Sequence, residues 1–393
     1  MRVVLPVAVG ATAIALGALA FGAGAARIAE VSTGPVGQRH GVADDAGKYA
    51  DDNGVITGQT LAALGMTVQR WTLLFDSANP TAISEAAFLD RALPVARSHR
   101  TEVILSLFQR GSAAPDATAF CAWAKTVAER WPQVRRFVIG NEVNALRFWS
   151  PQKLATDPDA GPRAYHAVLA ACYDALKAVS PQTQVIGFGF APRAVTKKST
   201  KPLAFLRKVG DLYRASGRTA PLMDAIAVHP YPNPNAQPPL PPGRAGYQDP
   251  DYFGIPQLDR VKQAAYDAFH GTAQKTPADG LSIVVDEVGY QTDTATNGQY
   301  TGDEVSPTVS DAEQATYHAQ IVALYACDPL VTDVLFFGLY DERQRNADAF
   351  SGGWQAGMLR PNGEPKESFD AVRIAIAAGC TTDPVRWVPL GPA

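Results

Sequence analysis

Short apolar runs alternate with longer amphipathic stretches along the chain from about Arg39 onward. This alternation is typical of parallel strands that are joined by crossover helices. Several runs, such as 103–105 and 283–285, are apolar throughout, as expected for strands buried on both faces. We interpret eight runs as strands, the number that a closed barrel requires: residues 39–43, 67–73, 102–107, 136–139, 184–188, 225–228, 282–285 and 334–337.

The stretches between these runs predict helices, several of which begin with Ser or Pro, residues favoured at helix N-termini. One segment, residues 229–256, is too rich in proline for a helix or a central strand and predicts a semi-rigid loop. No internal repeat or low-complexity linker divides the chain, so we predict an α/β fold with a single (β/α)8 TIM barrel over residues 26–393. The predicted helices are residues 84–99, 117–131, 162–179, 202–216, 256–269, 310–326 and 365–378.

The N-terminal 25 residues have the pattern of a secretory signal peptide. Arg2 precedes an uncharged apolar run over residues 3–21, and the small residues Ala23, Gly24 and Ala25 follow as a cleavage-site triplet. The run is nearly long enough for an uncleaved membrane anchor. Its proline and two internal glycines weaken that alternative, so we expect a secreted chain without stable membrane insertion once the signal is cleaved.

Composition excludes several classes of partner. The chain has 35 basic and 38 acidic residues and no basic cluster, so nucleic acid is not an expected partner. The four cysteines form no Cys-x-x-Cys motif, and no His-x-x-x-His pair occurs, so we expect no metal and no other cofactor. We expect the mature protein to be a monomer.

Two glutamates stand directly where predicted strands end. Glu142 follows the fourth strand and Glu287 follows the seventh. In a barrel of this type the loops after the strands carry the chemistry. Side chains projecting from these two ends can face each other across the barrel mouth, at the separation of about 5–5.5 Å that retaining glycoside hydrolysis needs.

With its neighbouring motifs, this pair resembles the large clan of retaining barrel glycoside hydrolases that includes the cellulase-type, β-mannanase and β-xylosidase families. The shared motifs are Asn141-Glu142, Glu287-Val288-Gly289, His229-Pro230-Tyr231 and Arg70 on the second strand. The resemblance implies that Glu142 is the general acid/base, that Glu287 is the nucleophile, and that Asn141 binds the sugar 2-hydroxyl.

The same resemblance gives roles to the other motif residues. Arg70 is expected to keep the nucleophile ionised. His229 and Tyr231 are expected beside Glu287 or the sugar bound there. Asp286 competes with Glu287 for the role of nucleophile, but successive side chains of a strand point to opposite faces, so we expect only one of the two to face the site.

Aromatic residues near the barrel mouth are candidates for stacking on sugar rings. Many clan members carry Trp at the end of the eighth strand, whereas this chain offers Tyr340 or the later Trp354. Asp44 and Asp45 after the first strand, and Asp76 after the second, are weaker candidates for hydroxyl contacts. The aromatic candidates are Trp71, Phe108, Phe148, Trp149, Tyr231, Tyr290, Tyr340 and Trp354.

The order of helices in a barrel also predicts disulfides. Cys121 and Cys172 lie in helices that follow the third and fourth strands, which are neighbours in the outer ring. Cys327 and Cys380 lie at the ends of the helices that flank the eighth strand. We therefore expect the pairs Cys121–Cys172 and Cys327–Cys380, with four buried free thiols as the alternative.

The sequence thus favours a retaining glycoside hydrolase that cleaves an oligo- or polysaccharide through a glycosyl-enzyme intermediate. An α-L-arabinofuranosidase on the same barrel is one alternative. A carbohydrate-binding barrel without catalytic activity is the other, and retention of both glutamates disfavours it.

Overall fold

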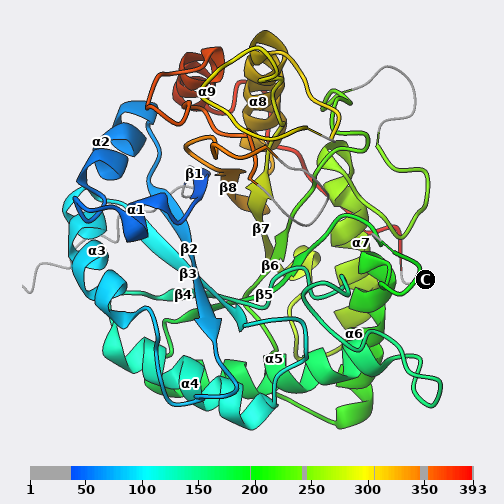
Figure 1. Cartoon of the computed structure of the whole chain (residues 1–393). Coiled ribbons are helices and arrows are strands. Elements are labelled where there is room, and N and C mark those ends of the chain that lie inside the picture. The colour runs from blue at the N-terminus through cyan, green and yellow to red at the C-terminus, as the bar shows by residue number, and fades with distance from the viewer. Residues whose placement is uncertain (1–36, 195, 241–245, 305, 346–352, 392–393) are drawn as a thin grey trace, which may run out of the picture. The chain divides into compact units, whose positions relative to one another are not determined.

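Eight parallel strands close a barrel in chain order from β1 to β8, as predicted (Figure 1). The computed structural model describes residues 37–194, 196–240, 246–304, 306–345 and 353–391, so the predicted signal segment lies outside the described residues. The strands are β1 Arg39–Ala43, β2 Val68–Phe75, β3 Glu102–Gln109, β4 Arg136–Ile139, β5 Gln184–Phe190, β6 Ala225–Val228, β7 Ser282–Val288 and β8 Val331–Phe337.

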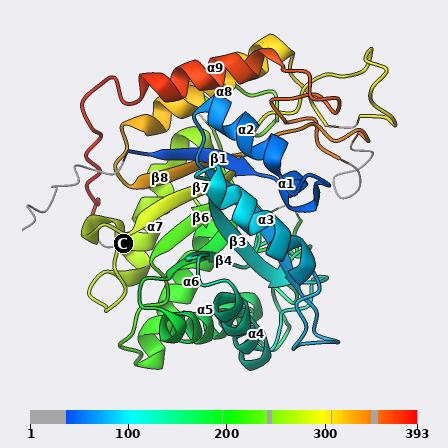
Figure 2. The same cartoon turned by 90° about the vertical axis from the view of Figure 1, so that its left-hand side faces the viewer.

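Helices surround the barrel as an outer ring (Figures 1 and 2). The seven predicted helices are all present, whereas α1 and α2 after the first strand were not predicted. Apolar residues do not gather on one face of α2, and its ends are set by two glycines in left-handed conformation, Gly54 and Gly65. The helices are α1 Ala46–Tyr49, α2 Val55–Leu64, α3 Ala86–Ser98, α4 Ala117–Arg130, α5 Ala160–Val179, α6 Pro202–Ser216, α7 Leu258–Phe269, α8 Asp311–Ala326 and α9 Glu367–Ala378, with short 3-10 helices at Ile255–Gln257 and Pro277–Asp279.

Two apolar layers hold the strands in place. The outer layer packs between strands and helices, and the inner layer fills the barrel with fully buried side chains. Because side chains alternate along a strand, Val68 of β2 points into the barrel and Trp71 packs in the outer layer. The inner layer consists of Val68, Ile104, Val138, Ile186, Ala225, Ala227, Val284 and Leu335.

Two disulfides tie neighbouring helices of the ring together. Cys121 of α4 bonds Cys172 of α5, and Cys327 at the end of α8 bonds Cys380 just after α9. These are the pairs that the helix order predicts. Within the described ranges, no helix is long and apolar enough to cross a membrane.

Candidate active site

A cavity of about 1280 Å³ opens at the carboxyl ends of the strands. The cavity is lined by loops that follow strands in the first and the second half of the barrel. The lining residues include Asn141, Glu142, Tyr231 and Glu287. It exceeds the roughly 300–1,000 Å³ of common small-molecule pockets. The cavity therefore has room for more than one sugar ring.

Glu142 stands on a tight turn that follows β4. Gly140 has a φ of 91°, and a Cβ at this position would lie 2.5 Å from Val143 Cγ1, so only glycine fits without a shift. Glu142 itself has a φ of 42°, an uncommon conformation for a residue with a side chain. Its backbone N–H donates to the carbonyl of Gly189, 2.6 Å away in the irregular end of β5. Two neighbouring strand ends thus hold Glu142 in a strained position of the kind found at functional sites.

The end of β7 brings both of its carboxylates to one cation, although only one of the two faces the cavity. Arg70 lies 3.2 Å from Asp286 Oδ2 and 2.7 Å from Glu287 Oε1, so both carboxylates point to the same cation. The reason is a shift in register: Val285 and Val288 of β7 pair with Val334 and Phe336 of β8, which leaves one extra residue in β7. Of the two, only Glu287 lines the cavity, and Asp286 is fully buried beneath it.

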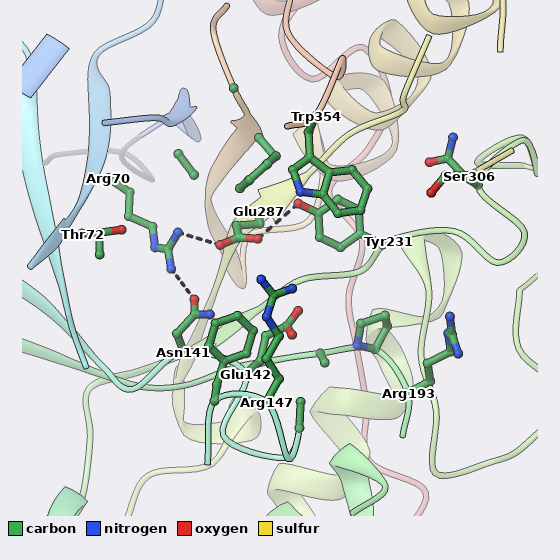
Figure 3. Close-up of a pocket in the computed structure, with 18 of the residues that line it drawn as sticks. Arg70, Thr72, Asn141, Glu142, Arg147, Arg193, Tyr231, Glu287, Ser306 and Trp354 are labelled. Atoms are coloured by element: carbon green, nitrogen blue, oxygen red, sulfur yellow. Dashed lines mark hydrogen bonds and ion pairs between the residues drawn. The ribbon is translucent and has the colours of Figure 1, made fainter. Parts of the chain in front are cut away.

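Arg70 joins Glu287 to Asn141 (Figure 3). One guanidinium nitrogen donates to Glu287 Oε1 at 2.7 Å, and the other donates to Asn141 Oδ1 at 2.7 Å and to Ser106 Oγ at 3.1 Å. Since arginine only donates, it fixes the amide of Asn141 with its oxygen toward Arg70. The amide nitrogen of Asn141 is thereby kept as a donor for a ligand.

His229 lies under the site and contacts all three carboxylates. Its Nδ1 is 3.4 Å from Glu142 Oε1 and 3.4 Å from Glu287 Oε2, and its Nε2 is 3.1 Å from Asp286 Oδ1. Burial alone would lower the pKa of His229, but the charges of Glu287 and Asp286 outweigh it and raise the pKa to about 10. The imidazole is therefore a cation at neutral pH. It is fully buried, so it acts on Glu142 and Glu287 and not directly on a ligand.

The shared contact with His229 limits the distance between the two glutamates. One oxygen of each lies 3.4 Å from the same Nδ1 atom, so these oxygens are separated by no more than twice 3.4 Å. Retaining glycosidases hold their carboxyl groups about 5–5.5 Å apart, and inverting ones about 6.5–9.5 Å apart. The bound on these two oxygens is compatible with the retaining spacing.

Aromatic side chains form the wall above Glu287. The Tyr231 hydroxyl donates to Glu287 Oε2 at 3.1 Å, and burial, together with the nearby carboxylates, raises the pKa of Tyr231 far above its usual value. The Tyr231 ring meets Phe337 edge-on, and Phe337 in turn meets Trp354. Trp354 is 36% exposed and lies over Glu287 and Tyr231 in Figure 3. This wall presents an aromatic surface to the cavity.

Of the remaining residues that the sequence suggested for the site, some line the cavity and others do not. Tyr340 and Asp44 line the cavity, but the Asp44 carboxylate accepts the backbone N–H groups of Ala46 and Leu339, each at 2.6 Å, and thereby joins the loops after β1 and β8. Burial raises the pKa of Asp44 against these hydrogen bonds. Trp71 does not line the cavity, because it points outward from β2 and is 1% exposed.

Asp45 and Asp76, the other two candidate aspartates, form hydrogen bonds that stabilise loops. Asp45 lines the cavity but accepts the backbone N–H of Thr72 at 2.8 Å and pairs with Lys48 at 3.2 Å. Asp76 does not line the cavity and closes a turn by accepting the N–H of Ala78. The described residues contain no cluster of three or more His, Cys, Asp or Glu side chains suited to a metal ion.

Several cavity residues were not predicted from the sequence. Arg147, Arg193, Tyr247 and Phe337 all line the cavity, and the first three come from long loops without periodic pattern. Phe337 ends β8 and was included only as part of that strand. Arg147 follows Glu142 by five positions, which was the one signal that could have drawn attention to it.

Solved structures share this barrel. The chain aligns with a family 39 glycoside hydrolase from Bacteroides cellulosilyticus at a TM-score of 0.60 and 18% identity, over 86% of this chain and 63% of that one. It aligns with a monomeric β-xylosidase from Caulobacter crescentus at 0.56 and 16%, over 87% and 68%. It also aligns with a GH5_18 protein from Streptomyces cattleya at 0.57 and 17%, over 87% and 80%.

These similarities confirm the resemblance to the retaining barrel clan at the level of the fold. The chain spans less than two thirds of the length of the Bacteroides protein, and identity is below 20% in each case. No protein-family model and no curated protein sequence matches the chain.

Proposed function

We propose that this protein is a retaining glycoside hydrolase that cleaves an oligo- or polysaccharide, with Glu287 as nucleophile and Glu142 as acid/base. The observation that carries the proposal is the common contact of both carboxylates with His229 Nδ1, which is compatible with the carboxyl spacing of retaining enzymes. The barrel shared with solved glycoside hydrolases supports the same assignment.

In the first step Glu287 attacks the anomeric carbon while Glu142 gives its proton to the departing oxygen. Glu287 is the better placed nucleophile of the two because Arg70 at 2.7 Å and the Tyr231 hydroxyl at 3.1 Å hold its carboxylate in position. Its side chain is 11% exposed, against 20% for Glu142. Glu142 is thus the carboxyl that water and a leaving group reach more readily.

In the second step water attacks the anomeric carbon, Glu142 takes its proton, and the bond to Glu287 breaks. Asn141 supports both steps from its fixed orientation, since its amide nitrogen can donate to the sugar 2-hydroxyl.

The test is to trap the intermediate. The purified protein is incubated with a panel of activated 2-deoxy-2-fluoro glycosides and weighed, and the labelled peptide is sequenced. We expect a mass increase of one fluoroglycosyl unit on the peptide containing Glu287. A label on the peptide containing Glu142 would reverse the roles. Absence of label, with inverted product from an aryl glycoside that the protein does cleave, would refute the retaining mechanism.

We also propose that the chain is exported and acts as a monomeric catalytic domain over residues 26–393, after cleavage of the signal at residues 1–25. The two disulfides support export because such bonds persist in oxidising compartments. N-terminal sequencing of the protein from culture medium tests cleavage. A chain that begins at Met1 and remains with the membrane fraction would support the anchor alternative.

A further inference from the structure

Charge is divided unevenly around the cavity. Four aspartates and glutamates besides Glu142 and Glu287 line it, and all belong to the loops after β1 and β8: Asp44, Asp45, Asp341 and Glu342. The lining cations other than Arg70 are Arg147 and Arg193, from the loops after β4 and β5. Among the described lining residues, Glu142 is the one acidic side chain on that side.

Each arginine interacts with an aromatic residue of the cavity. The guanidinium carbon of Arg147 lies 5.2 Å from the centre of the Phe148 ring, which also lines the cavity. Arg193 acts on the hydroxyl of Tyr247, where its charge and hydrogen bond oppose the effect of burial, which raises the Tyr247 pKa to about 12. Such contacts restrict a guanidinium before a ligand arrives and so reduce the entropy lost on binding.

The two arginines lie where a leaving group must pass. In Figure 3 Arg147 lies beside Glu142, and Arg193 lies on the side of Glu142 away from Arg70. On the proposed mechanism Glu142 protonates the departing oxygen, so the sugar beyond that oxygen meets this wall of the cavity. The carbonyl, hydroxyl or carboxylate groups of this sugar can therefore accept hydrogen bonds from the two guanidinium groups.

We propose that this side of the cavity binds a sugar residue bearing a carboxylate, so that the substrate is an oligosaccharide with a uronic acid on the leaving-group side. The inference rests on the proposed function for the direction of the leaving group. A planar carboxylate matches the donor fork of arginine, and two arginines facing a cavity favour an anion over a neutral hydroxyl group. The acidic loops after β1 and β8 disfavour the same anion at the opposite side.

Binding is measured by calorimetry on the full chain with disaccharide pairs that differ only in one C6 group, either hydroxymethyl or carboxylate, in glucose and galactose series. A sulfated disaccharide provides a third arm. We expect the uronate member of at least one pair to bind about tenfold or more tightly than its neutral partner, since hydrogen bonds to charged groups are worth that much. The preference should weaken as salt concentration rises.

Matched variants locate the effect. Arg147→Gln and Arg193→Gln should each reduce uronate affinity severalfold more than neutral affinity. Arg97→Gln removes the same charge from an exposed position on α3 and should leave the preference intact. Equal affinities for the neutral and uronate members of every pair would overturn the inference, and so would arginine variants that weaken the binding of both members equally. A preference for the sulfated disaccharide alone would show that the bound group is not a carboxylate. Because these are binding measurements, they decide the inference even if trapping at Glu287 fails.

Discussion

His229 Nε2 lies 3.1 Å from Asp286 Oδ1 at the floor of the cavity, and neither side chain is exposed to solvent. Two groups that are costly to bury alone are thus buried together, next to both glutamates of the proposed site. The other nitrogen of His229 contacts Glu142 and Glu287. Asp286 therefore holds in place the cation that lies between the two glutamates.

This relationship predicts the effect of Asp286→Asn. Loss of the anion should lower the pKa of His229 from about 10 by one unit or more, because an opposite charge at this distance shifts a pKa by about 1–3 units. NMR titration of His229 measures the change, and kcat is expected to fall more than KM changes. Asp45→Asn also removes a carboxylate from the cavity lining but makes no contact with His229, so it serves as control. An unchanged His229 titration would contradict the assignment.

The same pair has a consequence for stability. The folded pKa of His229 is above its ordinary value of 6.5, so its charge contributes stability fully below pH 6.5, and this contribution is lost as pH rises toward 10. Denaturant unfolding of the wild type and of Asp286→Asn between pH 6 and 10 measures it. The loss of stability with rising pH should be smaller in the variant.

Chemical rescue distinguishes the two glutamates. Glu287→Ala should abolish turnover, and azide should restore it with inverted product, because a small anion can occupy the cavity left by a nucleophile. Product stereochemistry by NMR is the measurement. Recovery of inverted product from Glu142→Ala, with Glu287→Ala remaining inactive, would mean that the roles are swapped.

Glu142→Ala should slow substrates with poor leaving groups by about 10²–10⁴-fold and spare those with activated leaving groups, which need no proton. The ratio of kcat/KM for two aryl glycosides of different leaving-group pKa measures this. The kcat/KM of the wild type should depend on pH as a bell-shaped curve. The limb of this curve that reports the general acid should be absent in Glu142→Ala. Equal losses for both substrates would contradict the role of Glu142.

At the amino ends of the strands, Asp333 lies 2.6 Å from Arg136 and 2.9 Å from Arg39, with no exposure to solvent. Burial raises the pKa of Asp333, but the two arginines outweigh it and hold the pKa below the ordinary 3.8. Asp333→Asn should cost about 3–5 kcal/mol of unfolding free energy, because it removes the fully buried anion that pairs with the buried Arg136. Urea unfolding measures the cost.

The sign of the pH effect follows from the lowered pKa. The stabilisation by Asp333 is present above pH 3.8 and is lost as pH falls through the folded pKa, so the difference between wild type and variant should shrink in acid. Glu129→Gln breaks an exposed pair with Lys125 and should cost less than about 1 kcal/mol. A similar cost for both variants would contradict the importance of burial.

The two disulfides predict which cysteine-containing peptides stay linked after digestion. Digestion without reductant should release Cys121 linked to Cys172 and Cys327 linked to Cys380. Their separations of 51 and 53 residues correspond to about 4 kcal/mol each in the chain-entropy model. Cys380→Ser should lower unfolding free energy by up to that amount. A peptide that links Cys121 to Cys327 would contradict the order of helices in the ring.

Local sequence patterns were sufficient to predict the barrel and the positions of the proposed glutamates. Strand and helix periodicity are local properties, so eight apolar runs and their intervening helices were readable without contacts. Glu142 and Glu287 could be assigned because each directly follows a strand, and strand ends of a parallel barrel meet at one face. The cysteine pairs followed from the same order.

Contacts that depend on strand register and on the paths of the loops could be identified only in the folded chain. Asp286 and Glu287 both meet Arg70 because β7 carries an extra residue against β8, and no local pattern distinguishes that irregularity from regular alternation. Arg147 and Arg193 meet at one cavity only because loops of separate strands converge there. Contacts of this kind depend on the packing of distant segments, whereas periodicity depends on neighbours in the chain.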